Sequence, residues 1–371
     1  MNLNVIMKNI NSVVIDDLEH IKTQISSEQS KFKDSTILMT GCGGFLGFYL
    51  INFFVYYASE LKIKKIIGLD NFILDKPDWL SALEIVNPEI LSVQNFDVSK
   101  DSIDEIQDSR KVTYVIHAAS IASPSFYRKH PLATVDANIW GLRKLLDFYL
   151  QEQSLKGFLF FSSSEIYGDP EPEMIPTNEE YRGKVSCHGP RACYDESKRF
   201  GETLCWIYGK EYKMPLTVVR PFNNYGPGMR LGDKRLPADF ANSVVNNKNI
   251  KILSNGSPTR TFCYVADAIS GYLLCLLHGK YDQFNIGTEE PEISVKDVAQ
   301  IYVDSAKDIF DFDLEVDFET SNDQAYLTDN PNRRCPDLSK AKSILGYKPS
   351  IGIEDGVRRY LKFIKIENIK I

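Results

Sequence analysis

The chain contains 371 residues, of which 43% are hydrophobic and 25% are charged, and its formal net charge at pH 7 is −7. These values are ordinary for a globular protein and argue against a disordered tail, a collagen-like repeat or a disulfide-stapled miniprotein. The acidic balance does not suit nucleic acid as the main partner, because neutralising phosphates requires a basic surface. No apolar run approaches the roughly eighteen residues that a membrane-spanning helix needs, so no membrane partner is expected.

The cysteines are scattered, and we expect them to be reduced thiols. Their number is odd, and no pair or Cys/His cluster has the spacing of zinc ligands, so no metal is expected. The N-terminus lacks a basic stretch followed by a long apolar run, which is the pattern of a secretory signal. These features predict a cytoplasmic protein. The seven cysteines are Cys42, Cys187, Cys193, Cys205, Cys263, Cys275 and Cys335.

Residues 1–35 are predicted to form an N-terminal helical extension. Apolar residues recur there at helical spacing, which indicates one amphipathic helix that packs on the main body or on a second subunit. The residues that carry this pattern are Val14, Ile15, Leu18, Ile21 and Ile25.

Short apolar strands alternate with helical segments over residues 36–220. This alternation predicts an α/β fold, a Rossmann-like doubly wound parallel sheet that binds ligands beyond the carboxyl ends of its strands. The predicted strands are STILMT, KKIIGLD, LSVQNFDVSK, VTYVIHAAS, GFLFFSSSEIYG and LTVVRPFNNYG, and the predicted helices are FYLINFFVYYASEL, Val135–Gln151 and Asp195–Tyr212.

Residues 221–371 are predicted to form a smaller, mixed, substrate-binding lobe, with residues 284–287 returning to the main sheet. IKILSNG and RTFCYVAD are predicted as strand-like segments around a turn. The predicted helices are PADFANSVVNN, ISVKDVAQIYVDSAKDI and CPDLSKAKSILGY.

A glycine turn follows the first predicted strand. Gly41, Gly44 and Gly47 form GxxGxxG between a strand and a helix, where glycine lets a pyrophosphate approach main-chain N–H groups. Asp70 ends the next strand, at a suitable distance to accept hydrogen bonds from the adenosine ribose. Its carboxylate would repel a 2′-phosphate, so the predicted cofactor is NAD; the alternative is a purely structural turn. Asp97 closes the third strand as a candidate contact to adenine, or as part of a surface turn.

Tyr194 and Lys198 stand four residues apart on one face of a predicted helix, in YDESK. A neighbouring ammonium favours the phenolate, which can accept a substrate hydroxyl proton as hydride leaves. The alternative is an exposed helix pair. A hydroxyl-rich strand end, residues 162–165, precedes this pair in the chain and favours the catalytic interpretation.

Five motifs, TGCGGFLG, HAAS, SSSEIYGD, YDESK and RPFNNYGP, occur in this order. The chain from Ser35 to its C-terminus resembles the extended short-chain dehydrogenase/reductase superfamily, the NAD-dependent epimerases and dehydratases of nucleotide sugars. Within it, ASIASPSFY, GPRACYDESK and SSSEIYGD are most similar to the UDP-glucuronate decarboxylases, or UDP-xylose synthases.

The resemblance implies roles for individual residues. Tyr194 would be the base at C4 of the sugar, Lys198 would lower its pKa, and Ser163 would bind the C4 oxygen. Ser164 and Glu165 would lie near C5. The remaining cofactor contacts would be Phe45, Leu46, Val98, Ala118, Ala119 and Ser120, and substrate contacts would be Ser123, Asn223, Arg235, Arg260 and Arg334.

Asn223 is expected at the sugar diphosphate. The three arginines of the substrate set, Arg235, Arg260 and Arg334, are expected to pair with phosphates, where guanidinium geometry suits the ligand. A surface salt bridge is the alternative for each of them. The helices Val135–Gln151 and Asp195–Tyr212 resemble those of a four-helix dimer interface, so a homodimer is expected.

Position 164 bears most on the reaction. The 4,6-dehydratases carry Asp-Glu where this chain has Ser164-Glu165, and a serine is too weak an acid to protonate a departing hydroxyl. Decarboxylation of UDP-glucuronate to UDP-xylose, through a transient 4-keto sugar with NAD regenerated, is therefore the predicted activity. A C4 epimerase stays open, because Gly228 stands where the decarboxylases have arginine. A catalytically idle nucleotide-sugar-binding protein is the alternative of another class.

Overall fold

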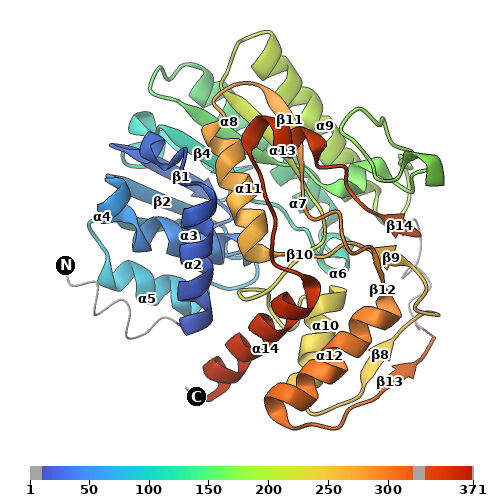
Figure 1. The fold of residues 1–371 in the computed structure, drawn as a ribbon. Coiled ribbons are helices and arrows are strands. Elements are labelled where there is room, and N and C mark those ends of the chain that lie inside the picture. Colours follow the sequence, from blue (N-terminus) through green and yellow to red (C-terminus); the bar gives the residue numbers. More distant parts are fainter. Residues whose placement is uncertain (1–10, 321–330, 370–371) are drawn as a thin grey trace.

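The computed structural model describes residues 11–320 and 331–369. Its centre is a seven-stranded parallel sheet of strand order β11-β6-β5-β4-β1-β2-β3 (Figure 1). The predicted doubly wound sheet is confirmed, and the strand order reverses beside β1, where such sheets bind ligands. The strands are β1 (Thr36–Thr40), β2 (Lys65–Asp70), β3 (Leu91–Asn95), β4 (Tyr114–His117), β5 (Gly157–Phe161), β6 (Leu216–Pro221) and β11 (Asp282–Ile286).

Helices cover both faces of the sheet, because successive side chains of a strand point to opposite sides. In β1, Ile37 and Met39 belong to the larger apolar cluster, whereas Leu38 belongs to the second cluster. The larger cluster includes α3 (Phe45–Tyr56) and α11 (Val265–Leu277), and the second includes α8 (Leu142–Leu150) and α9 (Ala192–Lys210). The chain thus forms three layers around two apolar interiors.

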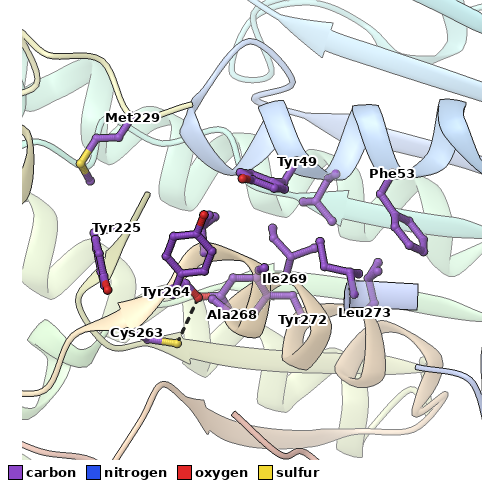
Figure 2. Packing of buried hydrophobic residues seen from close by; sticks show 14 of the residues in the cluster. Tyr49, Phe53, Tyr225, Met229, Cys263, Tyr264, Ala268, Ile269, Tyr272 and Leu273 are labelled. Atoms are coloured by element: carbon purple, nitrogen blue, oxygen red, sulfur yellow. Dashed lines mark hydrogen bonds between the residues drawn. The ribbon is translucent and has the colours of Figure 1, made fainter. Parts of the chain in front are cut away.

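The sequence predicts that RTFCYVAD is strand-like and that no helix follows it. This prediction is wrong, because helix α11 begins within the segment. Only β9 (Thr259–Arg260) and β10 (Cys263–Tyr264) are strands, and the helix begins at Val265. All thirteen residues of α11 are buried, so the segment lacks the polar stripe by which a surface helix is recognised. Figure 2 shows Tyr49 and Phe53 of α3 facing Ile269 and Leu273 of this helix.

The N-terminal helix α2 (Ser12–Gln24) packs beside α3 and α11 on the main body of the same chain (Figure 1). The Asn11 side chain caps its first turn by accepting a hydrogen bond from the Val13 N–H at 3.1 Å. Asp17 is fully buried and accepts hydrogen bonds from the hydroxyls of Tyr49 at 2.5 Å and Tyr264 at 2.7 Å. Burial raises the pKa of Asp17 to about 6. The extension therefore contacts the helix that follows the glycine turn.

Most of the chain beyond β6 lies at one edge of the sheet as a smaller set of elements (Figure 1). Helix α10 packs with α12 and α14, the parallel pair β8–β13 lies beside them, and β12, β9 and β14 form a three-stranded sheet. Helix α14 has no counterpart in the sequence analysis. The bounds are α10 (Leu236–Val245), β8 (Ile250–Ile252), β12 (Ile293–Ser294), α12 (Val295–Phe310), β13 (Val316–Phe318), β14 (Arg333–Arg334), α13 (Ser339–Leu345) and α14 (Ile353–Ile369).

Shorter elements complete the fold: α4 (Ala58–Leu61), α5 (Asp78–Val86), α6 (Pro124–Tyr127), α7 (Pro131–Val135), a π-helix at Asp136–Gly141 and β7 (Asn224–Tyr225). All seven cysteines are free. Within residues 11–320 and 331–369, the helices are too short or too polar to cross a lipid bilayer.

Candidate active site

The carboxyl ends of the sheet strands line a cavity of about 900 Å³, whose wall includes the last residues of β1, β2, β5 and β6. The structure brings all the site residues predicted from the sequence to this one cavity, while their individual roles remain predictions. The predicted residues that line it are Gly41, Gly44, Phe45, Leu46, Gly47, Asp70, Asp97, Val98, Ala118, Ala119, Ser120, Ser123, Ser163, Ser164, Glu165, Tyr194, Lys198, Asn223, Arg235, Arg260 and Arg334.

The glycine turn joins β1 to α3 and leaves no room for a side chain at Gly41 or Gly47. Gly41 has φ +75°, and a Cβ built there would lie 2.7 Å from the Ala119 nitrogen. A Cβ on Gly47 would lie 2.2 Å from the Cys42 carbonyl oxygen. Gly44 is the N-cap of α3 and, within the described residues, no side chain caps that helix, so its first N–H groups point toward the cavity end without a side-chain acceptor. Such amides suit a diphosphate.

Asp70 fixes the shape of this turn. Its two carboxylate oxygens accept hydrogen bonds from the N–H groups of Gly43 and Phe72, each at 2.9 Å. Burial raises the pKa of Asp70 above its ordinary value, and the two backbone donors act against that rise. Asp97 instead accepts from Ser99 and Lys100 within its own turn while it lines the cavity. Both carboxylates thus reach the cofactor side of the cavity.

The segment after β4 lies beside the glycine turn and lines the same cavity. The Ala119 N–H donates to the Thr40 hydroxyl at 3.2 Å, which holds the segment against β1. The Ser120 hydroxyl is buried and has no hydrogen-bond partner among the residues that the structure describes. Buried polar groups without a partner are rare, so Ser120 is suited to a ligand. The glycine turn, Asp70 and Ser120 together fit a dinucleotide.

Tyr194 and Lys198 lie in the first turns of α9, and both are buried. The Lys198 ammonium donates to the Phe161 carbonyl oxygen at 2.6 Å and lies 5.7 Å from the centroid of the Tyr194 ring. Burial raises the pKa of Tyr194 to about 12, although a hydrogen bond from Ser163 and the charge of Arg235 lower it. Burial lowers the pKa of Lys198 to about 7. The pKa of Tyr194 is therefore raised, whereas the resemblance implied that Lys198 lowers it, because burial outweighs the groups that favour the phenolate.

A cluster of charges occupies the next corner of the cavity. Glu165 forms ion pairs with Arg334 through one carboxylate oxygen and with Arg191 through the other. Arg334 also donates to the Ser164 hydroxyl at 3.1 Å. Burial would raise the pKa of Glu165, but the charges of Arg334, Arg191 and Arg260 hold it below its ordinary value. Glu165 is therefore an ionised group beside a neutral serine.

The other predicted substrate residues are held by the protein itself. Arg235 pairs with Asp233, and the Ser123 hydroxyl donates to the Asp233 carbonyl oxygen at 2.6 Å. Arg260 donates to the backbone carbonyls of residues 259, 331 and 332. The Asn223 amide donates to the Thr261 carbonyl oxygen at 2.9 Å. Phosphate contacts of these side chains stay predictions, and Arg334 lies beside the residues expected near C5 instead.

The structure explains why residue 228 is a glycine, although the decarboxylases that the chain resembles have arginine at this position. Its φ is +86°, and a Cβ there would lie 2.7 Å from Cδ1 of Phe48. Phe48 is packed edge-to-face against Trp79 and Phe363. An arginine at 228 would collide with this aromatic group, which includes a residue of α14.

Two residues of the site were not singled out by the sequence analysis. Arg191 lies three positions before Tyr194 in the motif GPRACYDESK, and this spacing at a helix start was the available signal. The Tyr127 ring stacks on the Tyr194 ring with centroids 5.2 Å apart and planes 11° from parallel. Nothing local to residue 127 predicts that stack, because it joins two segments that are far apart in the chain.

Known proteins resemble this chain over most of its length. A family model, "NAD dependent epimerase/dehydratase family", matches residues 37–287. UDP-glucuronic acid decarboxylase 1 of Xenopus tropicalis is 30% identical over 337 residues, which cover 89% of this chain and 72% of the relative. UDP-glucuronic acid decarboxylase 6 of Arabidopsis thaliana is 30% identical over 330 residues, covering 88% of this chain and 89% of the relative.

Solved structures share the fold. A Thermotoga maritima UDP-glucose 4-epimerase with UDP-glucose is 24% identical, with a TM-score of 0.75 over 90% of this chain and 99% of the other. A Bacillus cereus UDP-glucuronic acid 4-epimerase, in complex with UDP-glucuronic acid and NAD, is 24% identical, with a TM-score of 0.70 over the same shares. The chain is therefore a member of the NAD dependent epimerase/dehydratase family, and NAD is the cofactor of this enzyme.

Proposed function

We propose that the enzyme converts UDP-glucuronate to UDP-xylose and CO₂ through a transient 4-keto sugar, with NAD regenerated in each turnover. The curated relatives named UDP-glucuronic acid decarboxylases support this choice of substrate and reaction. NAD, which the glycine turn, Asp70 and Ser120 would hold, would supply the oxidation and the later reduction at C4 as hydride acceptor and donor.

The residues at the sugar end then have distinct tasks. Tyr194 takes the proton of the C4 hydroxyl and later gives one back, and Ser163, its hydrogen-bond partner, contacts the C4 oxygen. The Lys198 side-chain nitrogen lies 5.7 Å from the centroid of the tyrosine ring, and its protonated form would favour the phenolate.

Decarboxylation follows from the position of the carboxylate. Once C4 is a ketone, the C5 carboxylate belongs to a β-keto acid, so the C5–C6 bond breaks and its electron pair passes to the C4 carbonyl as an enolate. CO₂ leaves, C5 takes up a proton and C4 is reduced to the alcohol. The protein's contribution is to position the sugar and to stabilise the developing charge.

The observation that carries the proposal is the chemistry at Ser164 and Glu165. Dehydration needs an acid that protonates the departing C6 hydroxyl. Here Ser164 is a hydroxyl that accepts a hydrogen bond from Arg334, and Glu165 is kept ionised by Arg334 and Arg191. Neither side chain suits that role. Loss of CO₂ needs no such acid, and this arginine-rich corner suits a carboxylate.

The test is to incubate the NAD-loaded enzyme with UDP-glucuronate and to analyse the nucleotide sugar by mass spectrometry. The expected result is a product that has lost CO₂, and UDP-glucose, which lacks the carboxylate, should keep its mass in a parallel reaction. An unchanged mass with a 4-epimer seen by NMR would make the enzyme an epimerase. Loss of water would make the enzyme a dehydratase. If no nucleotide sugar were turned over, the chain would be a catalytically idle nucleotide-sugar-binding protein.

We also infer that the enzyme is a homodimer. Leu132, Trp140, Phe200 and Trp206 are 76%, 59%, 48% and 48% exposed, and they belong to the neighbouring elements α7, the π-helix and α9. Exposed apolar groups of this kind favour a protein contact. Light scattering at micromolar concentration should give the mass of a dimer, and Trp140→Asp should shift it toward a monomer. The control Ile85→Asp, at an exposed apolar residue of α5, should stay dimeric. A monomeric wild-type enzyme would refute the inference.

A further inference from the structure

Arg230 joins two loops that both contribute residues to the wall of the cavity. The β2 loop, residues 71–75, follows β2, and the β7 loop, residues 226–235, follows β7. The Arg230 guanidinium donates to the backbone carbonyl oxygen of Leu74 and, at 3.1 Å, to that of Asp75. A planar guanidinium can hold two acceptors in fixed directions, which an ammonium group cannot do. Arg230 therefore ties the two loops together.

The β2 loop is anchored at its start by Asp70. One carboxylate oxygen of Asp70 accepts a hydrogen bond from the Phe72 N–H, and the other accepts one from the Gly43 N–H in the glycine turn. Phe72 and Asp75 have φ values of 51° and 70°, and the Asp75 N–H donates to the Phe72 carbonyl oxygen at 2.9 Å. The β2 loop is therefore a tight turn that is bound to the glycine turn at one end and to Arg230 at the other.

The β7 loop is fixed at its base by α3 and α14. Gly228 lies against the ring of Phe48 in α3, and the Tyr360 hydroxyl of α14 donates to the Met229 carbonyl oxygen at 3.2 Å. Met229 and Tyr360 are both buried, whereas the next residue, Arg230, is exposed. The main body of the protein thus holds the base of the loop, and the Arg230 side chain reaches the β2 loop from that base.

The joined loops lie beside Asp70, the residue expected at the adenosine ribose. Burial raises the pKa of Asp70 above its ordinary value, and the charge of Arg230 is one of the influences that act against this rise. Asp70 and residues of both loops line the same cavity as the glycine turn. A dinucleotide held by the glycine turn and Asp70 could pass this side of the cavity only if the two loops separated.

We propose that Arg230 closes a strap over the cofactor: the β2 loop and the β7 loop, joined by its two hydrogen bonds, keep the reduced cofactor in place between the oxidation and the reduction of the sugar. Loops that close over a bound molecule can set its rate of release. If NADH left between the two steps, the keto sugar would stay unreduced. The inference goes beyond the proposed function, because any reaction that regenerates NAD within one turnover needs this retention, whichever sugar is used.

The experiment measures the release of NADH from the full-length enzyme with no sugar present. Protein loaded with NADH is mixed with a large excess of NAD, and the loss of the fluorescence of bound NADH gives the release rate. We expect Arg230→Met to raise this rate about tenfold or more, because one hydrogen bond from a charged donor contributes roughly that factor. Arg230→Lys should release NADH at an intermediate rate, since an ammonium group cannot hold both carbonyls. The matched control Arg358→Met, which removes an exposed ion pair with Asp308, should keep the wild-type rate.

The rate of entry separates a strap from a direct contact with the cofactor. NADH should also bind faster to Arg230→Met protein from which the cofactor has been removed, because the loops must part for entry as well as for release. An unchanged release rate in Arg230→Met, or in Arg230→Lys if the first variant does not fold, would overturn the proposal. Faster release with unchanged entry would also overturn it, since Arg230 would then contact the cofactor itself. Because no sugar is added, a failure to decarboxylate UDP-glucuronate would refute the proposed function and leave the strap standing.

Discussion

Replacing Tyr194 by phenylalanine is expected to lower the turnover of UDP-glucuronate by about 10²- to 10⁴-fold, the usual contribution of a positioned acid–base group. The substitution removes the hydroxyl that hydrogen-bonds to Ser163 and leaves the ring in place. That ring is buried and stacks on Tyr127 at 5.2 Å, so the first turn of α9 should keep its packing. Bound NAD and the melting temperature should therefore stay close to those of the wild-type enzyme.

The measurement combines single-turnover kinetics with the amount of NAD that copurifies with each variant. Tyr212→Phe is a suitable control, because Tyr212 lies just beyond α9 and is 57% exposed. Turnover at the wild-type rate in Tyr194→Phe would refute the assigned role. Loss of NAD together with activity would show instead that the hydroxyl supports the cofactor site.

Gly47→Ala is expected to have the second large effect. The added Cβ would lie 2.2 Å from the Cys42 carbonyl oxygen and 2.6 Å from the Cys42 carbonyl carbon, which are backbone atoms that cannot swing aside. Either α3 moves away from the glycine turn or the turn deforms, and overpacking of this kind costs about 1 to 3 kcal/mol. The first N–H groups of α3 would then no longer converge on the diphosphate.

The expected outcome for Gly47→Ala is a protein of lower melting temperature that copurifies with little NAD. Gly352→Ala is the matched control, because a Cβ at Gly352 meets nothing within 4 Å among the described residues. A Gly47→Ala protein with wild-type stability and a full complement of NAD would contradict the proposed role of the glycine turn in binding the diphosphate. Measuring NAD by absorbance after denaturation separates loss of cofactor from loss of fold.

Local sequence patterns were sufficient to predict the parallel sheet and many of the residues that line the cavity. Each strand of the sheet is a short apolar run, and Gly41, Gly44 and Gly47 stand directly between a strand and a helix, so neighbouring residues predict both. Asp70 was found in the same way, because the carboxyl end of a parallel strand reaches the ligand edge wherever the strand lies in the sheet. The spacing of Tyr194 and Lys198 likewise needs only one helical turn.

The sequence patterns failed where burial is complete or where contacts are distant. Helix α11 is buried on all sides and so shows no exposed polar stripe that alternates with apolar residues. The ion pair between Arg334 and Glu165 joins residues 169 positions apart, and only the return of the chain through β9 and β14 brings them together. The YDESK motif likewise does not predict the raised pKa of Tyr194, because that rise comes from burial in the folded protein.

By itself the amino-acid sequence determined the sheet, the glycine turn and the Tyr194–Lys198 pair, because each depends on residues within a few turns or one strand of one another. Only the tertiary structure decided what surrounds Glu165. Its two arginines come from the start of α9 and from β14, and the burial that makes their charges effective arises only when both segments close over the sheet.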